Sequence, residues 1–477
     1  MGLVKPVEPV PLADLGRVHF AAIGGAGMSG IARIMLARGV PVSGCDSAAS
    51  AQLDELAGLG AQVSVGHSAE HLDSADTLVV SSAIRTDNAE LTEANRRGMR
   101  VLHRAAGLAS VMLDRTGIAV AGTHGKTTTT SMLTTVLRAC GADPSYVIGG
   151  ILADTGLGAA DGEGTVFVAE ADESDGSFLM LGPEAAIVTC VEADHLDNYA
   201  SLAEIEDAFA AFARRISPGG LLVACADDPG ARRLVQGVAG APGAPAGLRV
   251  VTYGESSDAS YRVSGVTPDG MATEFDLAAG DQSVRLRVSV PGRHNALNAA
   301  AAYATAVELG FVPAEVAAGL ASYRGAMRRM EVKGEADGVR VLDSYAHHPT
   351  ELAADLSAAR DLAADGRVIA IFQPHLFSRT RIFASQFGAA LGEADEVFVL
   401  DVYAAREDPE PGVTGALVAD AVPGGRAVFC PDRAGVPAAI ADLAKPGDVV
   451  LTMGAGDVTK LGPLIVAALR GRAGDGA

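Results

Sequence analysis

The sequence lacks several features that would assign it to common protein classes. Its 477 residues include only five cysteines, and no two of these form a C-x-x-C pair. Scattered thiols of this kind predict neither a disulfide framework nor a zinc site, and they favour a reducing compartment. No run of about 18 apolar residues occurs, and the N-terminal stretch MGLVKPVEPVPLADLG has no apolar signal-peptide core. We therefore expect a soluble, cytoplasmic protein that does not cross a membrane.

Positive charge is also scarce. The formal net charge is −21, and the chain holds only five lysines, namely Lys5, Lys126, Lys333, Lys445 and Lys460. Nucleic acids and anionic membranes are bound by basic surfaces, so this composition argues against both kinds of partner. Because lysine is so rare here, a lysine that stands inside a glycine-rich turn is a strong signal.

The remaining composition indicates a globular chain of several domains. Hydrophobic residues make up 49% of the sequence, and at roughly 100–200 residues per domain this length predicts two to four domains. Strand-like apolar runs alternate with alanine-rich amphipathic stretches, which is typical of doubly wound parallel sheets. The clearest runs are 18–23, 117–121, 339–342, 368–372, 397–400 and 449–452. We predict three α/β domains, over 1–110, 111–325 and 326–477.

The first glycine turn has the G-x-G-x-x-G spacing, from Gly25 through Gly27 to Gly30, between the first apolar run and a helix predicted over 31–38. This spacing lets the backbone approach a pyrophosphate at a helix N-terminus. Asp46 ends the next strand-like run, from which its carboxylate could reach a ribose or a uridine. By itself the motif leaves a nicotinamide-dependent dehydrogenase and a purely structural turn open.

The second glycine turn is more specific, since it reads Gly122-Thr-His-Gly-Lys126-Thr127 after a strand. Backbone N–H groups in such a loop surround phosphate oxygens, a lysine neutralises the β- and γ-phosphates, and a threonine hydroxyl can bind Mg²⁺. Val120 stands where a complete Walker A motif has its leading glycine, so the loop is shorter than an ordinary P-loop. The turn predicts ATP as a ligand.

Two acidic segments follow apolar runs in the same region. Glu170 ends the run 166–170 and is followed by Asp172, Glu173 and Asp175, and a later segment contains Asp194, His195 and Asp197. Hard oxygen ligands and one imidazole beside a phosphate loop suit Mg²⁺. The alternative is that both segments are solvated acidic loops. The presence of two acidic clusters at strand ends argues against this alternative.

Together, eight motifs between residue 19 and about residue 458 resemble the Mur ligases, ATP-dependent enzymes of bacterial cell-wall precursor synthesis. The motifs are GGAGMSGIA, GTHGKTTTT, EADESDGSF, DHLDNY, GRHNALNA, SYAHHPTE, FQPHLFSRT and TMGAGDV. The resemblance implies a Rossmann-like UDP-sugar domain, a central P-loop-type ATPase domain and a C-terminal Rossmann-like amino-acid domain. It also implies ATP-dependent joining of L-alanine to the lactyl carboxylate of UDP-N-acetylmuramate, with two Mg²⁺ ions for which Mn²⁺ can substitute.

The resemblance assigns roles to residues of all three predicted domains. Those expected around UDP-N-acetylmuramate are Gly25, Gly27, Ser29, Gly30, Asp46, His67, Ser81, Ser82 and Arg104. Those expected at ATP are Gly122, Thr123, Gly125, Lys126, Thr127, Thr128, His294, Asn295, Asn298, Arg329, Asp343 and Tyr345. Those expected at magnesium are Thr127, Glu170 and His195, and those expected at alanine are Tyr345, His347 and Arg379. The expected catalytic residues are Lys126, His195, Asp343 and His347.

The chemistry that the resemblance implies begins with a poor acyl donor, because a carboxylate does not react with an amine directly. The lactyl carboxylate would attack the γ-phosphate of ATP, and the alanine amine would then displace phosphate from the acyl phosphate. The base that deprotonates the amine stays open between His347, His195 and a carboxylate. Because the acyl phosphate needs protection from water, we expect the third domain to close over ATP.

This chain departs from the family pattern in three places. Ser344 follows Asp343 where many relatives have a second aspartate, and Leu376 stands where many have an arginine, which leaves Arg379 to hold the alanine carboxylate. The segment 201–216 contains no lysine, so we expect no carbamylated lysine near the metal ions.

Three alternatives remain beside this prediction. A ligase that recycles murein peptides would add a preformed tripeptide to the same sugar, but its third-domain motifs differ from FQPHLFSRT. A nicotinamide-dependent dehydrogenase would leave the Gly-Lys-Thr loop without a role. A non-catalytic protein that binds a UDP-sugar would not need the acidic and histidine residues. The sequence leaves the oligomeric state open.

Overall fold

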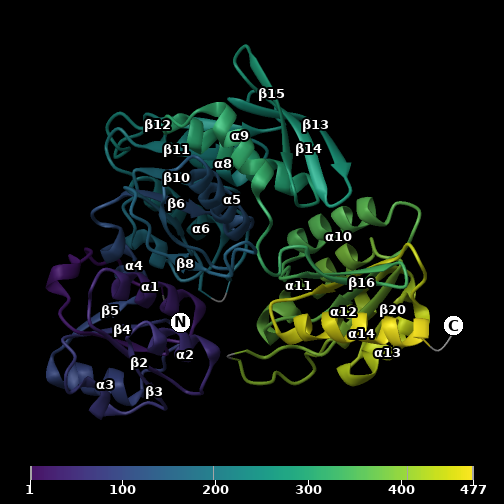
Figure 1. Ribbon diagram of the computed structural model, residues 1–477, viewed down its shortest axis with the longest axis horizontal. Coiled ribbons are helices and arrows are strands. Elements are labelled where there is room, and N and C mark those ends of the chain that lie inside the picture. The colour runs from purple at the N-terminus through teal and green to yellow at the C-terminus, as the bar shows by residue number, and fades with distance from the viewer. Residues whose placement is uncertain (1–2, 197, 406, 475–477) are drawn as a thin grey trace. The chain divides into compact units, whose positions relative to one another are not determined.

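The computed structural model describes residues 3–196, 198–405 and 407–474, and the strands form three separate sheets (Figure 1). Asp197, which belongs to one of the acidic segments, lies outside the described residues. Internal contacts divide the chain into two units. The first contains the chain through Ser264 with Asp276–Leu286 and Leu297–Tyr323, and the second contains Gly265–Phe275, Arg287–Ala296 and the chain from Arg324 onward. Within the described ranges, no helix combines the length and the apolar character needed to span a membrane.

The first sheet, drawn in purple and blue in Figure 1, has five parallel strands in the order β3-β2-β1-β4-β5. Its strands are β1 (Val18–Ala21), β2 (Val42–Asp46), β3 (Gln62–Val65), β4 (Thr77–Val80) and β5 (Arg100–His103). Its helices are α1 (Ala26–Ala37), α2 (Ala51–Gly58), α3 (Ala89–Arg97) and α4 (Arg104–Met112), with the 3₁₀ helices η1 (Leu12–Asp14) and η2 (Ala69–Leu72). The strand order reverses at β1, and ligands of open α/β sheets bind at such a point.

Helix α1 begins at Ala26, so the helix predicted to start at residue 31 is longer than expected. Gly25 has extended backbone angles and caps the helix, and its carbonyl accepts a hydrogen bond from Ser29 N at 2.8 Å. Gly27, Ser29 and Gly30 therefore lie inside the first turns of the helix. A Cβ on Gly30 would lie 2.9 Å from Ala159 Cβ, so this glycine is required by the packing of α1.

The second sheet has ten strands in the order β15-β14-β13-β12-β11-β10-β6-β9-β7-β8. Its strands are β6 (Thr116–Ala121), β7 (Ser145–Val147), β8 (Ala159–Ala160), β9 (Val166–Glu170), β10 (Ala185–Val188), β11 (Leu221–Cys225), β12 (Arg249–Gly254), β13 (Tyr261–Asp269), β14 (Ala272–Ala279) and β15 (Gln282–Val288). Its helices are α5 (Lys126–Ala139), α6 (Leu202–Ala213), α7 (Pro229–Val238), α8 (Arg293–Glu308) and α9 (Pro313–Ser322), with the 3₁₀ helix η3 (Ser177–Met180). The parallel strands β6, β9 and β10 at its centre present their carboxyl ends to the site described below.

Two parts of this sheet depart from the parallel strand order that the sequence predicts. Strand β8 is antiparallel to β7. Strands β13, β14 and β15 follow one another through two-residue connections, which permit only antiparallel neighbours. Gly270 and Gly280 in these turns have φ of 56° and 57°. A glycine in a two-residue connection between strands of alternating polarity is a hairpin signal, and the sequence contains it in both turns.

The third sheet, in green and yellow in Figure 1, has the order β16-β17-β21-β18-β19-β20, and only the β16–β17 pair is antiparallel. Its strands are β16 (Glu331–Ala336), β17 (Val339–Ser344), β18 (Val368–Phe372), β19 (Glu396–Leu400), β20 (Ala427–Cys430) and β21 (Val449–Met453). Its helices are α10 (Pro349–Ala363), α11 (Phe377–Leu391), α12 (Ala416–Ala421), α13 (Val436–Leu443) and α14 (Leu461–Gly474), with the 3₁₀ helices η4 (Pro423–Gly425), η5 (Arg433–Gly435) and η6 (Asp457–Lys460).

Both faces of the third sheet are buried. Along β18, Val368, Ala370 and Phe372 belong to one apolar cluster, whereas Ile369 and Ile371 belong to another on the opposite face. Continuous apolar strands are expected where helices cover both faces of a parallel sheet. The runs 339–342, 368–372, 397–400 and 449–452 predicted from the sequence all lie within strands.

Candidate active site

The loop between β6 and α5 comprises residues 122–125, and at two of these positions the backbone has angles that only glycine adopts readily. The φ angles are 135° at Gly122 and 80° at Gly125. A Cβ on Gly122 would overlap Thr189, and a Cβ on Gly125 would lie 2.7 Å from Asn298 Oδ1. The loop leads into the N-terminus of α5, where free N–H groups and the helix dipole favour an anion.

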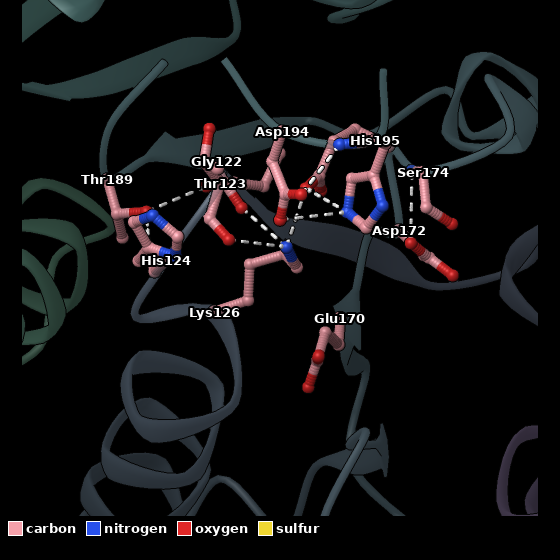
Figure 2. Close-up of polar contacts among 12 residues, drawn as sticks. Gly122, Thr123, His124, Lys126, Glu170, Asp172, Ser174, Thr189, Asp194 and His195 are labelled. Atoms are coloured by element: carbon pink, nitrogen blue, oxygen red, sulfur yellow. Dashed lines mark hydrogen bonds and ion pairs between the residues drawn. The ribbon is translucent and has the colours of Figure 1, made fainter. Parts of the chain in front are cut away.

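Lys126 is the first residue of α5, and its ammonium group folds back over the loop (Figure 2). Nζ donates to the Gly122 carbonyl at 2.6 Å, the Thr123 carbonyl at 3.2 Å and Glu173 Oε1 at 2.8 Å. Burial disfavours the charged ammonium, but the carboxylates of Glu173 and Asp172 outweigh it and raise the pKa of Lys126 above its ordinary value. The loop therefore holds a fixed positive charge.

Thr127 and Glu170 place hard oxygen atoms next to this charge. Thr127 Oγ1 donates to Glu170 Oε1 at 3.0 Å, and Gly149 N donates to Glu170 Oε2 at 2.6 Å. Glu170 is the last residue of β9 and pairs in register with Val120 of β6, so it lies at the same sheet edge as the loop. A hydroxyl oxygen and a carboxylate oxygen are ligands that suit a Mg²⁺ ion.

Glu173 and His195 extend the acidic side of the site, as Figure 2 shows for His195. Only 2% of Glu173 is exposed, and burial raises its pKa despite the nearby Lys126 and His195. Within the part of the chain that the structure describes, Glu173 Oε2 has no hydrogen-bond partner. His195 Nε2 lies 3.7 Å from Glu173 Oε1 and 3.6 Å from Asp194 Oδ2. A buried carboxylate oxygen without a donor fits the charge of a cation.

A salt bridge connects this site with the first glycine turn. Arg104, the first residue of α4, pairs with Asp172. Burial raises the pKa of Asp172, but Arg104 and Lys126 together hold it below the ordinary value. A Cβ on Gly27 would lie 3.4 Å from Arg104 Nη1. Gly27, Arg104, Asp172, Glu173 and Lys126 therefore form a continuous row within the first unit.

Ser82 makes a second connection between the first two sheets. Its hydroxyl bonds to Asp175 Oδ2 and lies 3.0 Å from His103 Nε2. Burial lowers the pKa of His103, so its imidazole favours the neutral form. Ser81 is partly buried beside it. Ser82 is thus the member of this pair that the fold brings to the acidic segment.

Asp46 and His67 lie at the same edge of the first sheet but have different partners. Asp46 Oδ2 accepts a hydrogen bond from Gly24 N at 3.0 Å, which fixes it under the first glycine turn. His67 Nδ1 lies 3.0 Å from Glu90 Oε2 and 3.1 Å from Cys45 Sγ. His67 is therefore tied to a buried cluster behind the turn.

Of the remaining residues expected at ATP, two are held near α5. Thr128 lies on the buried first turn of α5. Asn298, on α8, accepts a hydrogen bond from Thr129 Oγ1 at 3.2 Å. The other predicted residues, His294, Asn295, Arg329, Asp343, Tyr345, His347 and Arg379, belong to the second unit.

In the second unit, Asp343 at the end of β17 is fully buried and strongly bound. It accepts hydrogen bonds from Thr452 Oγ1 at 2.6 Å and Thr459 Oγ1 at 2.7 Å, and Arg328 Nε lies 3.4 Å from Oδ2. The guanidinium groups of Arg328 and Arg329 stack over the Tyr345 ring, 4.8 Å and 5.1 Å from its centroid. Asp343 therefore fixes Arg328, which in turn positions the Tyr345 ring.

His347 follows strand β17 in the chain, and Arg379 follows strand β18. His347 Nδ1 lies 3.0 Å from the Tyr345 carbonyl and 3.3 Å from Glu351 Oε2. Arg379 is buried in the first turn of α11, which follows Leu376 at a positive φ of 67°. His347 therefore has two polar partners at one ring nitrogen.

His294 and Asn295 stand at the start of α8. Asn295 Nδ2 donates to the Pro291 carbonyl at 2.7 Å. His294 Nε2 lies 3.6 Å from Asp355 Oδ1, and burial lowers the pKa of His294 to about 4. Burial raises the pKa of Asp355 to about 7, although its hydrogen bond with Ser344 opposes this shift. Burial therefore disfavours the charged form of both groups.

Asp172, Glu173 and Arg328 are among the charged residues of these networks that were not predicted as site residues from the sequence. Asp172 and Glu173 stand in the acidic segment, so the signal was present, but only the contacts with Arg104 and Lys126 separate them from solvated acids. Arg328 is adjacent to the predicted Arg329 and has a positive φ of 60°. No local pattern distinguishes the two arginines.

Comparison with protein families gives three matches in chain order. Residues 17–116 match the Mur ligase family catalytic domain, 120–306 the Mur ligase middle domain, and 328–456 the Mur ligase glutamate ligase domain. Among solved structures, the chain is similar to a UDP-N-acetylmuramate–alanine ligase from Thermotoga maritima, with a TM-score of 0.79 and 28% identity over 96% of this chain and 99% of that one. A murein peptide ligase from Psychrobacter arcticus shares the fold, with a TM-score of 0.69 and 24% identity over 95% of this chain and 99% of that one.

Two curated relatives are closer in sequence. The UDP-N-acetylmuramate–L-alanine ligase of Thermobifida fusca is 58% identical over 98% of this chain and 100% of its own length. The protein of the same name from Kineococcus radiotolerans is 56% identical over 95% of this chain and 96% of its own length. With this similarity along nearly the whole sequence, the chain belongs to the Mur ligase family, in its UDP-N-acetylmuramate–L-alanine ligase group.

Proposed function

We propose that the chain joins L-alanine to the lactyl carboxylate of UDP-N-acetylmuramate, with ATP activating that carboxylate as an acyl phosphate. The observation that carries the proposal is the row Gly27–Arg104–Asp172–Glu173–Lys126. It runs from the glycine turn suited to a sugar diphosphate to the loop suited to ATP. An enzyme that brings a sugar carboxylate to a γ-phosphate needs both anions held beside fixed positive charges.

At the ATP end, the proposal gives Lys126 the role of neutralising charge on the phosphates. Its ammonium is bound by two loop carbonyls and by Glu173. A phosphate that enters the loop can replace the carbonyl contacts, since a charged acceptor binds an ammonium more strongly than a neutral one. Glu173 would keep the ammonium oriented during this exchange, which makes it a positioning residue.

For magnesium, the proposed ligands are Thr127, Glu170 and His195, and Glu173 lies beside His195. Hard oxygen donors, and a buried carboxylate oxygen that lacks a donor among the described residues, fit a divalent cation. When bound, Mg²⁺ would supply neutralisation of phosphate charge. In this proposal the fold positions the Thr127 hydroxyl, the Glu170 carboxylate and the His195 imidazole for the ion.

At the sugar end, Arg104 is proposed to face the diphosphate and lactyl part of UDP-N-acetylmuramate. Its guanidinium lies beside the helix turn at Gly27 and is fixed by Asp172. A guanidinium held by one carboxylate keeps donors for a second anion. Asp46 under the turn is proposed to meet the uridine or its ribose.

At the alanine end, Arg379 is proposed to bind the carboxylate of the amino acid. His347 is proposed to lie near its ammonium, because it is paired with Glu351 and with the Tyr345 carbonyl. The proton acceptor for the amine stays open between His347, His195 and a carboxylate. We also propose that the three predicted domains, 1–110, 111–325 and 326–477, bind sugar, ATP and amino acid respectively, which the three separate sheets support.

The test is a phosphate-release assay with ATP, UDP-N-acetylmuramate and a panel of amines. We expect release to require the sugar and to be stimulated by L-alanine. Stimulation by a murein tripeptide and not by alanine would replace this proposal with the recycling ligase. Reduction of a nicotinamide cofactor at its absorbance band would indicate a dehydrogenase instead.

A further inference from the structure

A buried cluster in the first sheet contains four side chains that can bind a metal ion. They are His19 on β1, Cys45 on β2, His71 on η2 and Glu90 in the first turn of α3. One ligand atom from each lies within 4.8 Å of every other. His19, Cys45 and Glu90 are buried and His71 is partly buried, so the four groups meet in a low-dielectric interior.

Glu90 is the centre of this cluster. Its side chain is fully buried, and Oε1 lies 2.8 Å from His71 Nδ1, 2.8 Å from Cys45 Sγ and 3.5 Å from His19 Nε2. A tetrahedral site with metal–ligand bonds of about 2.0–2.3 Å has ligand–ligand edges of about 3.3–3.8 Å, so the His19 contact already has this length and the two shorter contacts would lengthen as the ion enters. A buried carboxylate also needs a compensating positive charge, and its ion-pair partners among the described residues are imidazoles.

His19 provides an independent observation. Its Nδ1 lies 2.8 Å from Ser43 Oγ, and its Nε2 is buried without a hydrogen-bond partner among the described residues. When Nδ1–H donates to Ser43, Nε2 carries a lone pair that faces Glu90 and Cys45. A hydrogen bond from the outer ring nitrogen is the arrangement that orients metal-binding histidines. A network of hydrogen bonds alone leaves this lone pair unused.

We propose that His19, Cys45, His71 and Glu90 form a tetrahedral site for Zn²⁺, separate from the magnesium site of the ATP loop. A thiolate, two imidazoles and a carboxylate suit zinc, whereas Mg²⁺ prefers oxygen ligands. The thiolate and the carboxylate balance the charge of the ion. Binding displaces the Cys45 thiol proton to solvent, and the Nδ1 proton of His71 moves to Nε2, so one proton is released per ion.

The site would join parts of the fold that are distant in sequence. His19 and Cys45 lie on neighbouring parallel strands, and η2 and α3 cover the same face through Leu72 and Ala94. His67 contacts both Glu90 Oε2 and Cys45 Sγ, so it acts as a positioning residue for two ligands. The ion would therefore fix η2 and α3 against the sheet behind the first glycine turn.

The first experiment measures zinc in the full chain, purified without chelator and without a metal-binding tag. We expect about one zinc ion per chain, and after chelator treatment we expect Co²⁺ to restore a tetrahedral spectrum with a thiolate-to-cobalt charge-transfer band. Excess Mg²⁺ should not displace the ion. Absence of bound zinc together with absence of a cobalt spectrum, or displacement by Mg²⁺, would overturn the proposal.

Variants then identify the ligands. In Cys45→Ser the charge-transfer band should be lost, whereas in Cys430→Ser, a partly buried cysteine on β20, it should remain. In His71→Gln added Zn²⁺ should no longer raise the melting temperature, and in His67→Gln zinc affinity should fall roughly 10–100-fold, as for residues that orient ligands. A charge-transfer band that persists in Cys45→Ser would assign the thiolate to another cysteine and refute the site. The spectrum of the unmodified chain decides the matter even if a variant fails to fold.

Discussion

At the scale of single residues, Lys126 is the group whose surroundings are most restrictive. It is partly buried at a helix start, and its charge is compensated by Glu173 and Asp172. A charged group in such a place destabilises the folded state when its partner is removed. The same arrangement raises the pKa of Lys126 and favours the protonated ammonium, so its role in the proposed reaction is electrostatic.

We expect Lys126→Ala to lower the rate of ADP formation by about a hundredfold or more, because a fixed charge on the transferred phosphate is lost. UDP-N-acetylmuramate affinity should change little, since Arg104 and the first glycine turn are untouched. A coupled ADP assay and calorimetric titration with the sugar measure the two effects. Lys445→Ala, which removes an exposed lysine before β21, is the matched control. Loss of sugar binding in Lys126→Ala would show that the ligand sites are misassigned.

The pair of Asp355 and His294 gives a prediction on pH. The pKa of Asp355 is raised to about 7 from 3.8, so its contribution to stability is full below about pH 4 and is lost as the pH rises through about 7. The pKa of His294 is lowered to about 4 from 6.5, so its contribution has the opposite sign and grows with pH between those values.

Asp355→Asn removes only the first of these contributions. The melting temperature of the variant minus that of the unmodified chain should therefore become more positive from about pH 5 to about pH 8. Scanning calorimetry across this range measures it, with Asp361→Asn, an exposed change on the same helix, as the control. Parallel curves for Asp355→Asn and the unmodified chain would contradict the assigned pKa.

At the scale of elements, α1 is positioned by a glycine that the helix itself does not need. Gly30 lies within α1, and a Cβ there would be 2.9 Å from Ala159 Cβ of β8. Because β8 belongs to the second sheet, this contact fixes the first glycine turn relative to the nucleotide loop within the first unit. A helix interior otherwise prefers alanine to glycine.

We expect Gly30→Ala to destabilise the chain by about 1–3 kcal/mol, as overpacking of a tight contact does. Gly58→Ala, at the end of α2 where nothing lies within 4 Å of the new Cβ, should be neutral or stabilising. Chemical denaturation of both variants gives the comparison. If both changes had the same effect, the close approach of α1 and β8 would not be the reason for Gly30.

At the scale of the whole molecule, the residues proposed to act in one reaction belong to both units. Lys126 and Arg104 belong to the first unit, and His347 and Arg379 belong to the second. The proposed acyl phosphate reacts with water unless the site is closed. We therefore propose, as expected from the sequence, that the third domain closes over ATP when substrates bind.

We expect the radius of gyration from small-angle X-ray scattering to fall when UDP-N-acetylmuramate and a non-hydrolysable ATP analogue are added together. Each ligand alone should have a smaller effect, and Lys126→Ala should reduce the response to the pair. An unchanged scattering profile with both ligands bound would rule out closure as the way in which the intermediate is protected.

The sequence by itself determined the local chemistry of this protein. The strand–glycine–helix pattern at Gly25 and Gly122 and the Lys126-Thr127 pair depend on backbone conformations and neighbours a few residues away, so they can be recognised in one segment. The same holds for the apolar runs of the third sheet. The hairpins of β13–β15 carried a local signal too, in Gly270 and Gly280, which the alternation of helices and strands elsewhere obscured.

Only the tertiary structure decided which charges meet. Glu173 binds Lys126 from 47 residues away, and Arg104 binds Asp172 across 68 residues. The cluster of His19, Cys45, His71 and Glu90 draws its four residues from separate elements, so their spacing in the sequence does not resemble a metal motif. Such contacts arise from the order in which parallel strands pack, and that order depends on the burial of apolar surface over the whole sheet. No short segment contains this information.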